Sequence, residues 1–159
     1  MMTMEVQEMD VFMERAVELA VSNVKHGGQP FGAVLVKDGE VVAEGVNELH
    51  HTYDISAHAE LVAIRQVQQK LQTNDLSGYT MYASGEPCPM CLTAMYFASI
   101  DQVYYGASVE DAAEIGLTTS KRIYEDLRKS KTERSLPTAQ MPLREGQKDP
   151  MKLWEEGNR

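Results

Sequence analysis

The chain has 159 residues, of which 43% are apolar and 25% are charged, a composition typical of a single globular domain with its own core. Its 24 Asp and Glu outnumber its 15 Lys and Arg, and the net charge of −9 argues against a nucleic-acid partner, because phosphate contacts need a basic surface. No apolar run reaches the roughly 18 residues of a membrane span, and the first ten residues do not resemble a secretory signal. We therefore expect a cytoplasmic protein with no membrane partner.

The first half of the chain predicts a helix, a hairpin and a second helix. Apolar residues recur at helical spacing from Met9 to Ala20, and a glycine pair ends the pattern. Two short runs rich in valine then flank Asp38 and Gly39, a pair that favours a tight hairpin turn. The predicted elements are a helix from about residue 9 to 26, strands over 31–36 and 41–46, and a helix over 57–71.

The second half predicts strands and helices in alternation. The predicted elements are a strand over 79–83, a helix over 88–98, a strand over 102–106, helices near 110–115 and 123–129, an edge strand over 138–143 and a short helix over 150–156. The basic stretch 121–134 also contains acids, so it is interpreted as a solvated helix face. Alternating strands and helices after a hairpin predict a three-layer α/β/α domain with a mixed central sheet. Residues 1–159 are expected to form that single domain.

Two short motifs, separated by thirty residues, carry the chemistry. His58 and Glu60 lie in Ala57-His58-Ala59-Glu60, and the only two cysteines lie in Pro87-Cys88-Pro89-Met90-Cys91. Either motif alone is a weak signal. Together, each at the start of a predicted helix, they match the signature of zinc deaminases. The sequence therefore predicts a Zn2+ site with His58, Cys88 and Cys91 as ligands.

Counting ligands distinguishes three interpretations of the cysteine pair. Structural zinc sites are closed by four protein ligands, whereas two cysteines and His58 leave one tetrahedral position open, as in a catalytic site. Closure by His26, His50 or His51 would instead give a structural site. A thioredoxin-like redox pair is the third possibility, but it leaves His58 and Glu60 unexplained. The catalytic metal site is the favoured interpretation.

The helix starts explain how the motifs can converge. Residues two apart do not share a helix face, but they can meet just beyond a helix N-terminus. Cys88 followed by Pro89 fits an N-cap and first helical position, and the partial positive charge of a helix start favours thiolates. Glu60 is the predicted catalytic residue, since a carboxylate beside an activated water can shuttle its proton. Glu86 is expected to hydrogen-bond a loop or a ligand's surroundings rather than to take part in the chemistry.

From about residue 31 to 124 the chain resembles the cytidine deaminase superfamily, and within it the bacterial guanine deaminases. The blocks that carry the resemblance are Pro30-Phe31-Gly32-Ala33-Val34, Gly45-Val46-Asn47, Ala57-His58-Ala59-Glu60, Glu86-Pro87-Cys88-Pro89-Met90-Cys91 and Asp111-Ala112-Ala113-Glu114-Ile115-Gly116. The resemblance implies the same metal ligands and the same role for Glu60. It also implies that Asn47 hydrogen-bonds the substrate ring and that Phe31 stacks on it, although Phe31 could equally be a core aromatic.

Two departures from the guanine-type pattern concern the substrate. Where that branch has an acidic pair reading the base, this chain has Thr118 and Thr119, which can donate or accept a hydrogen bond. In that branch the tail is exchanged between subunits and ends in an aromatic residue at the partner's site. Here Trp154 is the last aromatic residue, and it could cover the substrate or anchor the last helix. The resemblance implies a homodimer, with residues 136–159 as the exchanged segment.

These features favour a zinc-dependent hydrolytic deaminase that acts on a small aminated nucleobase or nucleoside and releases ammonia. The main alternative is deamination of adenosine to inosine in tRNA with the same catalytic residues, which the acidic composition disfavours. Another base, such as cytosine or an aminated triazine or pyrimidine, is also compatible with the motifs. A zinc-binding interaction module without catalysis is the remaining possibility.

Overall fold

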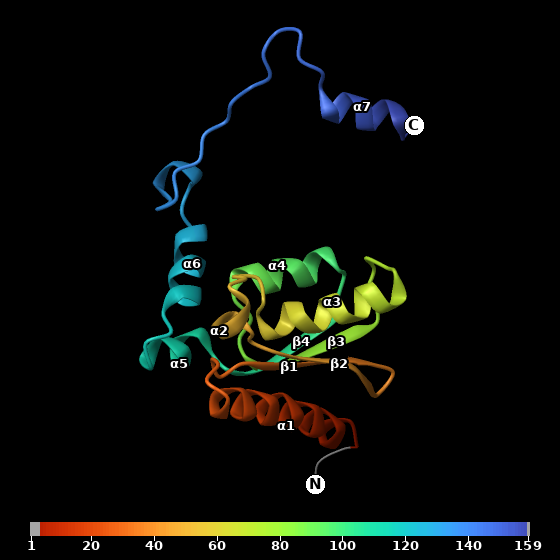
Figure 1. The fold of residues 1–159 in the computed structure, drawn as a ribbon, viewed down its shortest axis with the longest axis vertical. Helices are drawn as coiled ribbons and strands as arrows, with labels where there is room; N and C mark the ends of the chain where they lie inside the picture. Colours follow the sequence, from red (N-terminus) through yellow and green to blue (C-terminus); the bar gives the residue numbers. More distant parts are fainter. Residues whose placement is uncertain (1–3, 159) are drawn as a thin grey trace. The chain divides into compact units, whose positions relative to one another are not determined.

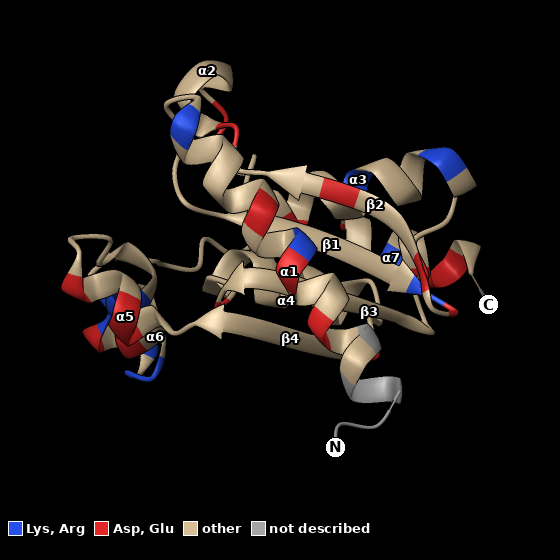
Figure 2. Ribbon diagram, turned by 90° about the horizontal axis from the view of Figure 1, so that it is seen from below, with Lys and Arg blue, Asp and Glu red and all other residues tan. Residues whose placement is uncertain are grey.

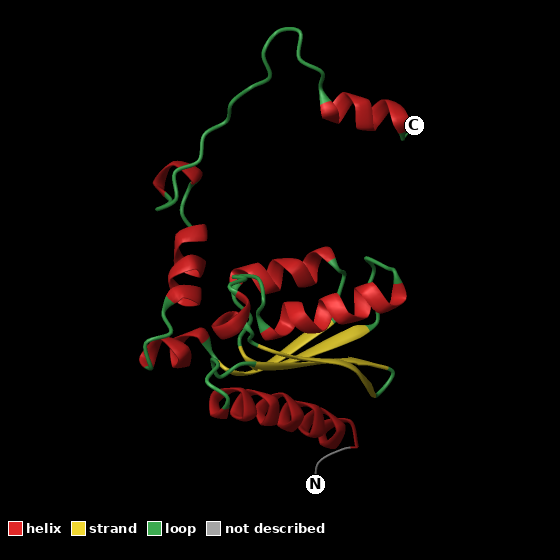
Figure 3. Ribbon diagram, viewed as in Figure 1, coloured by secondary structure: helices red, strands yellow, loops and turns green. Residues whose placement is uncertain are grey.

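A mixed four-stranded sheet forms the centre of the protein in the computed structural model, which describes residues 4–158 (Figure 3). The strand order is β2-β1-β3-β4, with β1 antiparallel to both of its neighbours and β3 parallel to β4. The strands are β1 Gly32–Lys37, β2 Glu40–Val46, β3 Tyr79–Gly85 and β4 Gln102–Ala107. The mixed sheet of an α/β domain is therefore confirmed.

Helices cover both faces of the sheet and make the domain three layers deep (Figure 1). One helix, α1 Met4–Lys25, lies on one face, and α3 Ala59–Leu71 and α4 Pro89–Phe97 lie side by side on the other. After β4 follow α5 Val109–Glu114 and α6 Thr119–Leu127, the latter starting four residues before its predicted position. A short helix, α2 Leu49–Thr52, was not expected, since four residues show no helical periodicity.

Strand β1 explains why both faces need a helical layer. Ala33 and Leu35 point into the core beneath α3 and α4, whereas Val34 and Val36 point into the core beneath α1. Successive side chains of a strand face opposite sides of its sheet, so an uninterrupted apolar strand requires cover on both. The continuous valine-rich run of β1 is thus the sequence signature of the three layers.

Two glycines allow the helices to approach the sheet closely. A Cβ on Gly32 would overlap the backbone carbonyl of Ala16 on α1, and a Cβ on Gly45 would overlap that of Ala59 on α3. Gly45 pairs with Ala33 on β1, the residue after Gly32, so the two approaches lie close together on opposite faces. Since α3 follows directly from His58, Gly45 fixes the depth at which that helix begins.

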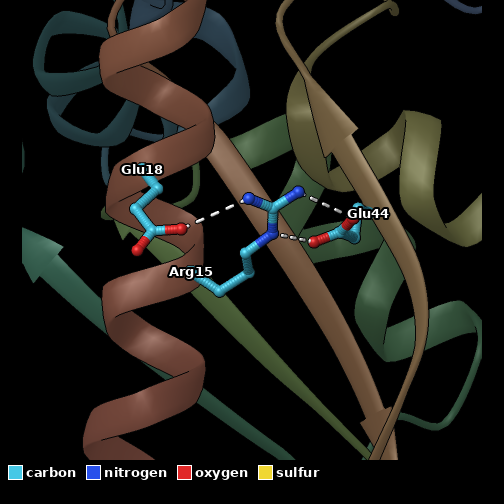
Figure 4. A network of polar contacts seen from close by, with 3 residues as sticks. All are labelled: Arg15, Glu18 and Glu44. Atoms are coloured by element: carbon cyan, nitrogen blue, oxygen red, sulfur yellow. Dashed lines mark hydrogen bonds and ion pairs between the residues drawn. The ribbon is translucent and has the colours of Figure 1, made fainter.

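An exposed ion pair joins α1 to the edge of the sheet (Figure 4). Arg15 donates to Glu44 on β2 through Nε and, at 3.1 Å, through Nη2, and it also donates to Glu18 at 3.3 Å. The hydrogen bonds from Arg15 hold the pKa of the Glu44 carboxyl below its usual value. Exposed pairs of this kind contribute at most about 1 kcal/mol, so this one orients α1 more than it stabilises the fold.

Residues 126–159 form a second compact unit. It contains a 3-10 helix over Lys131–Glu133 and the helix α7 Pro150–Gly157, which is capped by the carboxylate of Asp149. Residues 138–143, predicted as an edge strand, form a loop, so that prediction is wrong. Pro142 has no backbone N–H to donate, and the described residues provide no strand that pairs with this segment.

Charged residues of both signs are mixed on the surface of the sheet domain (Figure 2). Arg15 on α1, for example, lies between the acids Glu18 and Glu44. None of the described helices combines the length and the apolar character that crossing a membrane requires.

We predict that Gly45→Ala lowers the free energy of unfolding by about 2 kcal/mol or more, because its methyl group would force α3 away from the sheet. Gly157→Ala is the matched control, since a Cβ there meets no atom within 4 Å. Urea unfolding followed by circular dichroism would give both values. Equal transition midpoints for the two variants would contradict this account of the packing.

Candidate active site

The starts of α3 and α4 place the two sequence motifs beside each other. Cys88 is the N-cap of α4 with Pro89 in the first turn, as the sequence predicted. His58 is the N-cap of α3, which begins two residues after its predicted start at residue 57. Both N-cap residues have extended backbone, with ψ of 153° and 167°, so each helix begins abruptly after its metal-ligand candidate. Cys91, one turn later on α4, points back toward the same place and is fully buried.

Three side chains meet there with the spacing of a metal site. His58 Nδ1 lies 3.4 Å from Cys88 Sγ and 3.6 Å from Cys91 Sγ, and the three potential ligand atoms all lie within 4.8 Å of one another. Two thiols and one imidazole are the donor set that zinc prefers. These residues can therefore hold one Zn2+ ion and leave its fourth tetrahedral position for water or substrate.

The other histidines do not complete this cluster in the described part of the chain. His26 Nδ1 contacts the backbone oxygen of Ser22, and His50 and His51 contact each other. Among the residues that the structure describes, His58, Cys88 and Cys91 are the only group of side chains placed to hold a metal ion. A closed structural zinc site thus gains no support from the geometry.

The electrostatics of the cysteine pair favour a bound cation. Hydrogen bonding from the Cys91 thiol, aided by His58, lowers the pKa of Cys88 to about 4, and the contact between the two sulfurs raises the pKa of Cys91. The backbone N–H of Cys91 also donates to Cys88 Sγ at 3.4 Å, as expected at a helix N-terminus. This hydrogen bonding stabilises negative charge on Cys88 Sγ, as suits a metal ligand.

Glu60 lies in the first turn of α3 and is 6% exposed. Its burial raises the pKa of its carboxyl, and the nearby Cys88 thiolate raises it further. A carboxyl group with a raised pKa can both accept and release a proton near neutral pH. Glu60 thus has the environment expected of a general acid and base.

A cavity of about 420 Å³ opens beside His58, Cys88 and Glu60. This volume is within the range typical of small-molecule sites. Its remaining walls come from the loop before β1, the end of β2, and the α5–α6 region. The lining residues include Gln29, Phe31, Asn47, Ile55, Met90, Ala112, Leu117, Thr119, Ser120 and Ile123.

The predicted substrate residues differ in where they lie. Phe31, Asn47 and Thr119 line the cavity, and Asn47 is almost fully buried. Thr118 is exposed, just before α6 begins. Trp154 is an exposed side chain on α7 of the second unit. Contacts between any of these residues and a substrate stay predictions.

Two hydrogen bonds tie the cavity wall to the metal loop; a loop contact of Glu86 was expected from the sequence, whereas that of Tyr124 was not. Glu86 Oε1 accepts from the backbone N–H of Val109 at the start of α5, at 3.1 Å. The hydroxyl of Tyr124 on α6 donates to the carbonyl of Pro87 at 2.5 Å. Burial, with the negative charge of Glu86, raises the pKa of Tyr124 to about 12, so its hydroxyl keeps the proton that it donates. Both α5 and α6 are therefore anchored directly before Cys88.

Comparisons with known proteins agree with this site. Residues 6–107 match the model of the cytidine and deoxycytidylate deaminase zinc-binding region. The chain is 44% identical over 146 residues to the guanine deaminase of Bacillus subtilis, which covers 91% of this chain and 92% of that protein. The X-ray structure of that guanine deaminase superposes with a TM-score of 0.85 at 42% identity, covering 98% of this chain and 95% of that one.

Other relatives match a smaller share of the chain. A tRNA-specific adenosine deaminase of Agrobacterium fabrum is 43% identical over 96 residues, which is 60% of this chain and 63% of that protein. A solved structure in complex with 2,6-diaminopurine is 31% identical, with a TM-score of 0.63, and covers 66% of this chain and 59% of that one. The resemblance stated from the motifs is confirmed, and the similarity to a guanine deaminase extends beyond them.

We predict that the purified protein binds one zinc ion per chain and that Cys91→Ala abolishes this binding, because only two ligands remain. Removing zinc with a chelator should also lower the melting temperature, since the metal binds the folded chain. Metal content by plasma mass spectrometry and a thermal melt measure both effects. Met90→Leu, between the two cysteines, is the control that keeps its zinc; full occupancy in Cys91→Ala would exclude this ligand set.

Proposed function

The chain belongs to the cytidine and deoxycytidylate deaminase family, and we propose that this member deaminates a free purine base, with guanine as the first candidate. It is a zinc-dependent hydrolytic deaminase. The observation that carries the choice of guanine is the 44% identity to a guanine deaminase over 91% of the chain, whereas the tRNA adenosine deaminase relative matches 60%. The net charge of −9 also disfavours a tRNA substrate.

The site residues account for hydrolytic deamination. Zinc held by His58, Cys88 and Cys91 would supply the Lewis acid that makes water reactive at neutral pH. Glu60 would accept a proton from the attacking water and pass it to the base, and the amino group would leave as ammonia. The reaction consumes one water and replaces a ring amino group with a carbonyl, so no redox partner is needed.

The cavity would hold the base between its walls. We propose that Asn47 hydrogen-bonds the ring, that Phe31 stacks on it, and that Thr119 contacts its far edge, since all three residues line the cavity. Because α5 and α6 are anchored beside Cys88, the wall that carries Thr119 would keep a fixed distance from the metal.

We also propose that the protein is a cytoplasmic homodimer in which residues 136–159 are exchanged. Tyr96 and Phe97 at the end of α4 are 78% and 85% exposed, and Met141 and Trp154 of the second unit are also exposed. A unit of this length cannot build a core of its own. A partner subunit would cover these apolar surfaces in both units. Two cysteines do not make the disulfide framework typical of a small secreted domain, which agrees with a reducing compartment.

We predict that the zinc-loaded protein releases ammonia from guanine and that Glu60→Gln lowers kcat at least about 100-fold, because the proton shuttle is lost. A coupled ammonia assay measures this effect, and Glu110→Gln on the exposed start of α5 is the matched control. The substrate panel should also include adenine, cytosine, an aminated triazine, guanosine and tRNA. Ammonia from tRNA adenosine alone would replace the proposed substrate, and no ammonia from any compound would reject deamination.

We predict that light scattering after size exclusion gives about twice the chain mass of 17.8 kDa. Replacing Tyr96 and Phe97 with lysines should yield a monomer, because it places charge on the apolar surface that the partner would bury. Val11→Lys introduces a lysine at an exposed valine of α1 and should leave the dimer intact. A monomeric wild-type protein would rule out the proposed assembly.

A further inference from the structure

Two neighbouring carboxamides line the cavity beside the catalytic residues. Asn47, at the end of β2, is 1% exposed, and Gln29 lies in the loop before β1. Asn47 Nδ2 donates to Gln29 Oε1 at 3.3 Å, so the two side chains form a pair. Glutamine at position 29 is part of none of the motifs that the sequence revealed.

The backbone of both residues is held by one buried side chain. Asn23 on α1 donates through Nδ2 to the carbonyl of Gln29 at 2.8 Å and to the carbonyl of Asn47 at 2.9 Å. The carbonyl of Gln29 also accepts from the N–H of Phe31 at 2.8 Å. The loop that carries Gln29 is therefore positioned as firmly as the strand end that carries Asn47.

Hydrogen bonding assigns which amide atoms of the pair are oxygen and which are nitrogen. The backbone N–H of Leu49 donates to Asn47 Oδ1 at 3.1 Å, and a backbone N–H can only donate, so this atom must be the amide oxygen. Asn47 Nδ2 is then the donor to Gln29, whose contacting atom must be its oxygen. Each side-chain oxygen thus already accepts one hydrogen bond from the protein. The donors that the pair can offer to a ligand are the second N–H of Asn47 Nδ2 and the N–H groups of Gln29 Nε2.

We propose that Gln29 and Asn47 form a donor pair that selects a base with two adjacent acceptors, namely a 6-oxopurine read through O6 and N7. This inference rests on the proposed function and deepens it. Guanine presents O6 and N7 as neighbouring acceptors, whereas a 6-aminopurine presents a donor beside N7. A 6-amino group would bring N–H against N–H and leave polar groups unpaired, so the pair also rejects the wrong base.

The test compares guanine with 2,6-diaminopurine, which carry the same 2-amino group and differ at position 6 and in the proton on N1; the Gln29 variants isolate the part of the preference that depends on position 6. Chromatography follows the product formed at position 2. The wild-type protein should favour guanine in kcat/KM. Gln29→Glu keeps one oxygen to accept from Asn47 but places its other oxygen, an acceptor, toward the substrate. It should lower the ratio of kcat/KM for guanine to kcat/KM for 2,6-diaminopurine by about tenfold, mostly through KM.

Gln66→Glu is the matched control, because it makes the same charge change on an exposed residue of α3 that does not line the cavity. Its ratio should equal that of the wild-type protein. Gln29→Ala should lower the ratio less than Gln29→Glu, since it removes a donor without adding an acceptor. An unchanged ratio in Gln29→Glu, with guanine turnover intact, would overturn the proposal.

A binding experiment separates this proposal from the proposed function. In the Glu60→Gln background, calorimetry with hypoxanthine and adenine compares a 6-oxo with a 6-amino purine without turnover. Preference for hypoxanthine that Gln29→Glu removes would support the donor pair even if guanine proved not to be deaminated. Equal binding of the two bases, or a preference that Gln29→Glu leaves intact, would overturn it.

Discussion

The meeting of two helix starts at one point is the constraint on which the rest of the structure depends. His58 ends the loop before α3, and Cys88 ends the loop after β3, so the metal cluster exists only where the two N-termini converge. Side chains in the first turn of a helix spread outward, which lets His58 and Glu60 share a site although they are two residues apart. Proline in the first turn of α4 fixes the direction in which that helix leaves Cys88.

The sheet supplies the precision that this convergence requires. Strand β1 pairs with both β2 and β3, so it links the strand that leads toward His58 with the strand that leads toward Cys88. Gly45 lets α3 rest on the backbone of β2, and Met81 and Leu35 fill the space beneath α3 and α4. A zinc site tolerates ligand displacements of only a few tenths of an ångström. Close packing of this core therefore serves the chemistry as well as the stability.

The sequence predicts features that lie within short segments, and it does not predict contacts that form only when distant segments fold together. The metal ligands, Glu60 and the N-cap role of Cys88 lie in short motifs whose spacing has a direct physical meaning. The alternation of strands and helices likewise predicts the layers. The predicted strand over 138–143 was wrong because strand propensity needs a pairing neighbour, and α2 was missed because it has a single turn.

Contacts between residues far apart in the chain account for most of the site features that the sequence did not predict. Tyr124 and Pro87 are 37 positions apart, and Asn47 and Gln29 are 18 apart, so no periodicity in the sequence links them. Both contacts use ordinary side chains whose role is set by tertiary structure. A glutamine in a loop is usually a solvated residue, and only the buried bonds of Asn23 and Asn47 give Gln29 a defined direction.

Reactivity and selectivity consequently reside in different parts of the fold. In the proposed function, the groups that break the bond come from the starts of α3 and α4, which pack on the sheet. The groups that would face the substrate's other edges come from the loop before β1 and from α6, a helix with no buried residue. Neutral hydroxyls and amides line those walls, and such groups recognise a base by the direction of its hydrogen bonds rather than by its charge. Under this proposal, changing a single amide there to a carboxylate would reverse that direction and leave the metal ligands in place, so the same catalytic centre could serve another base.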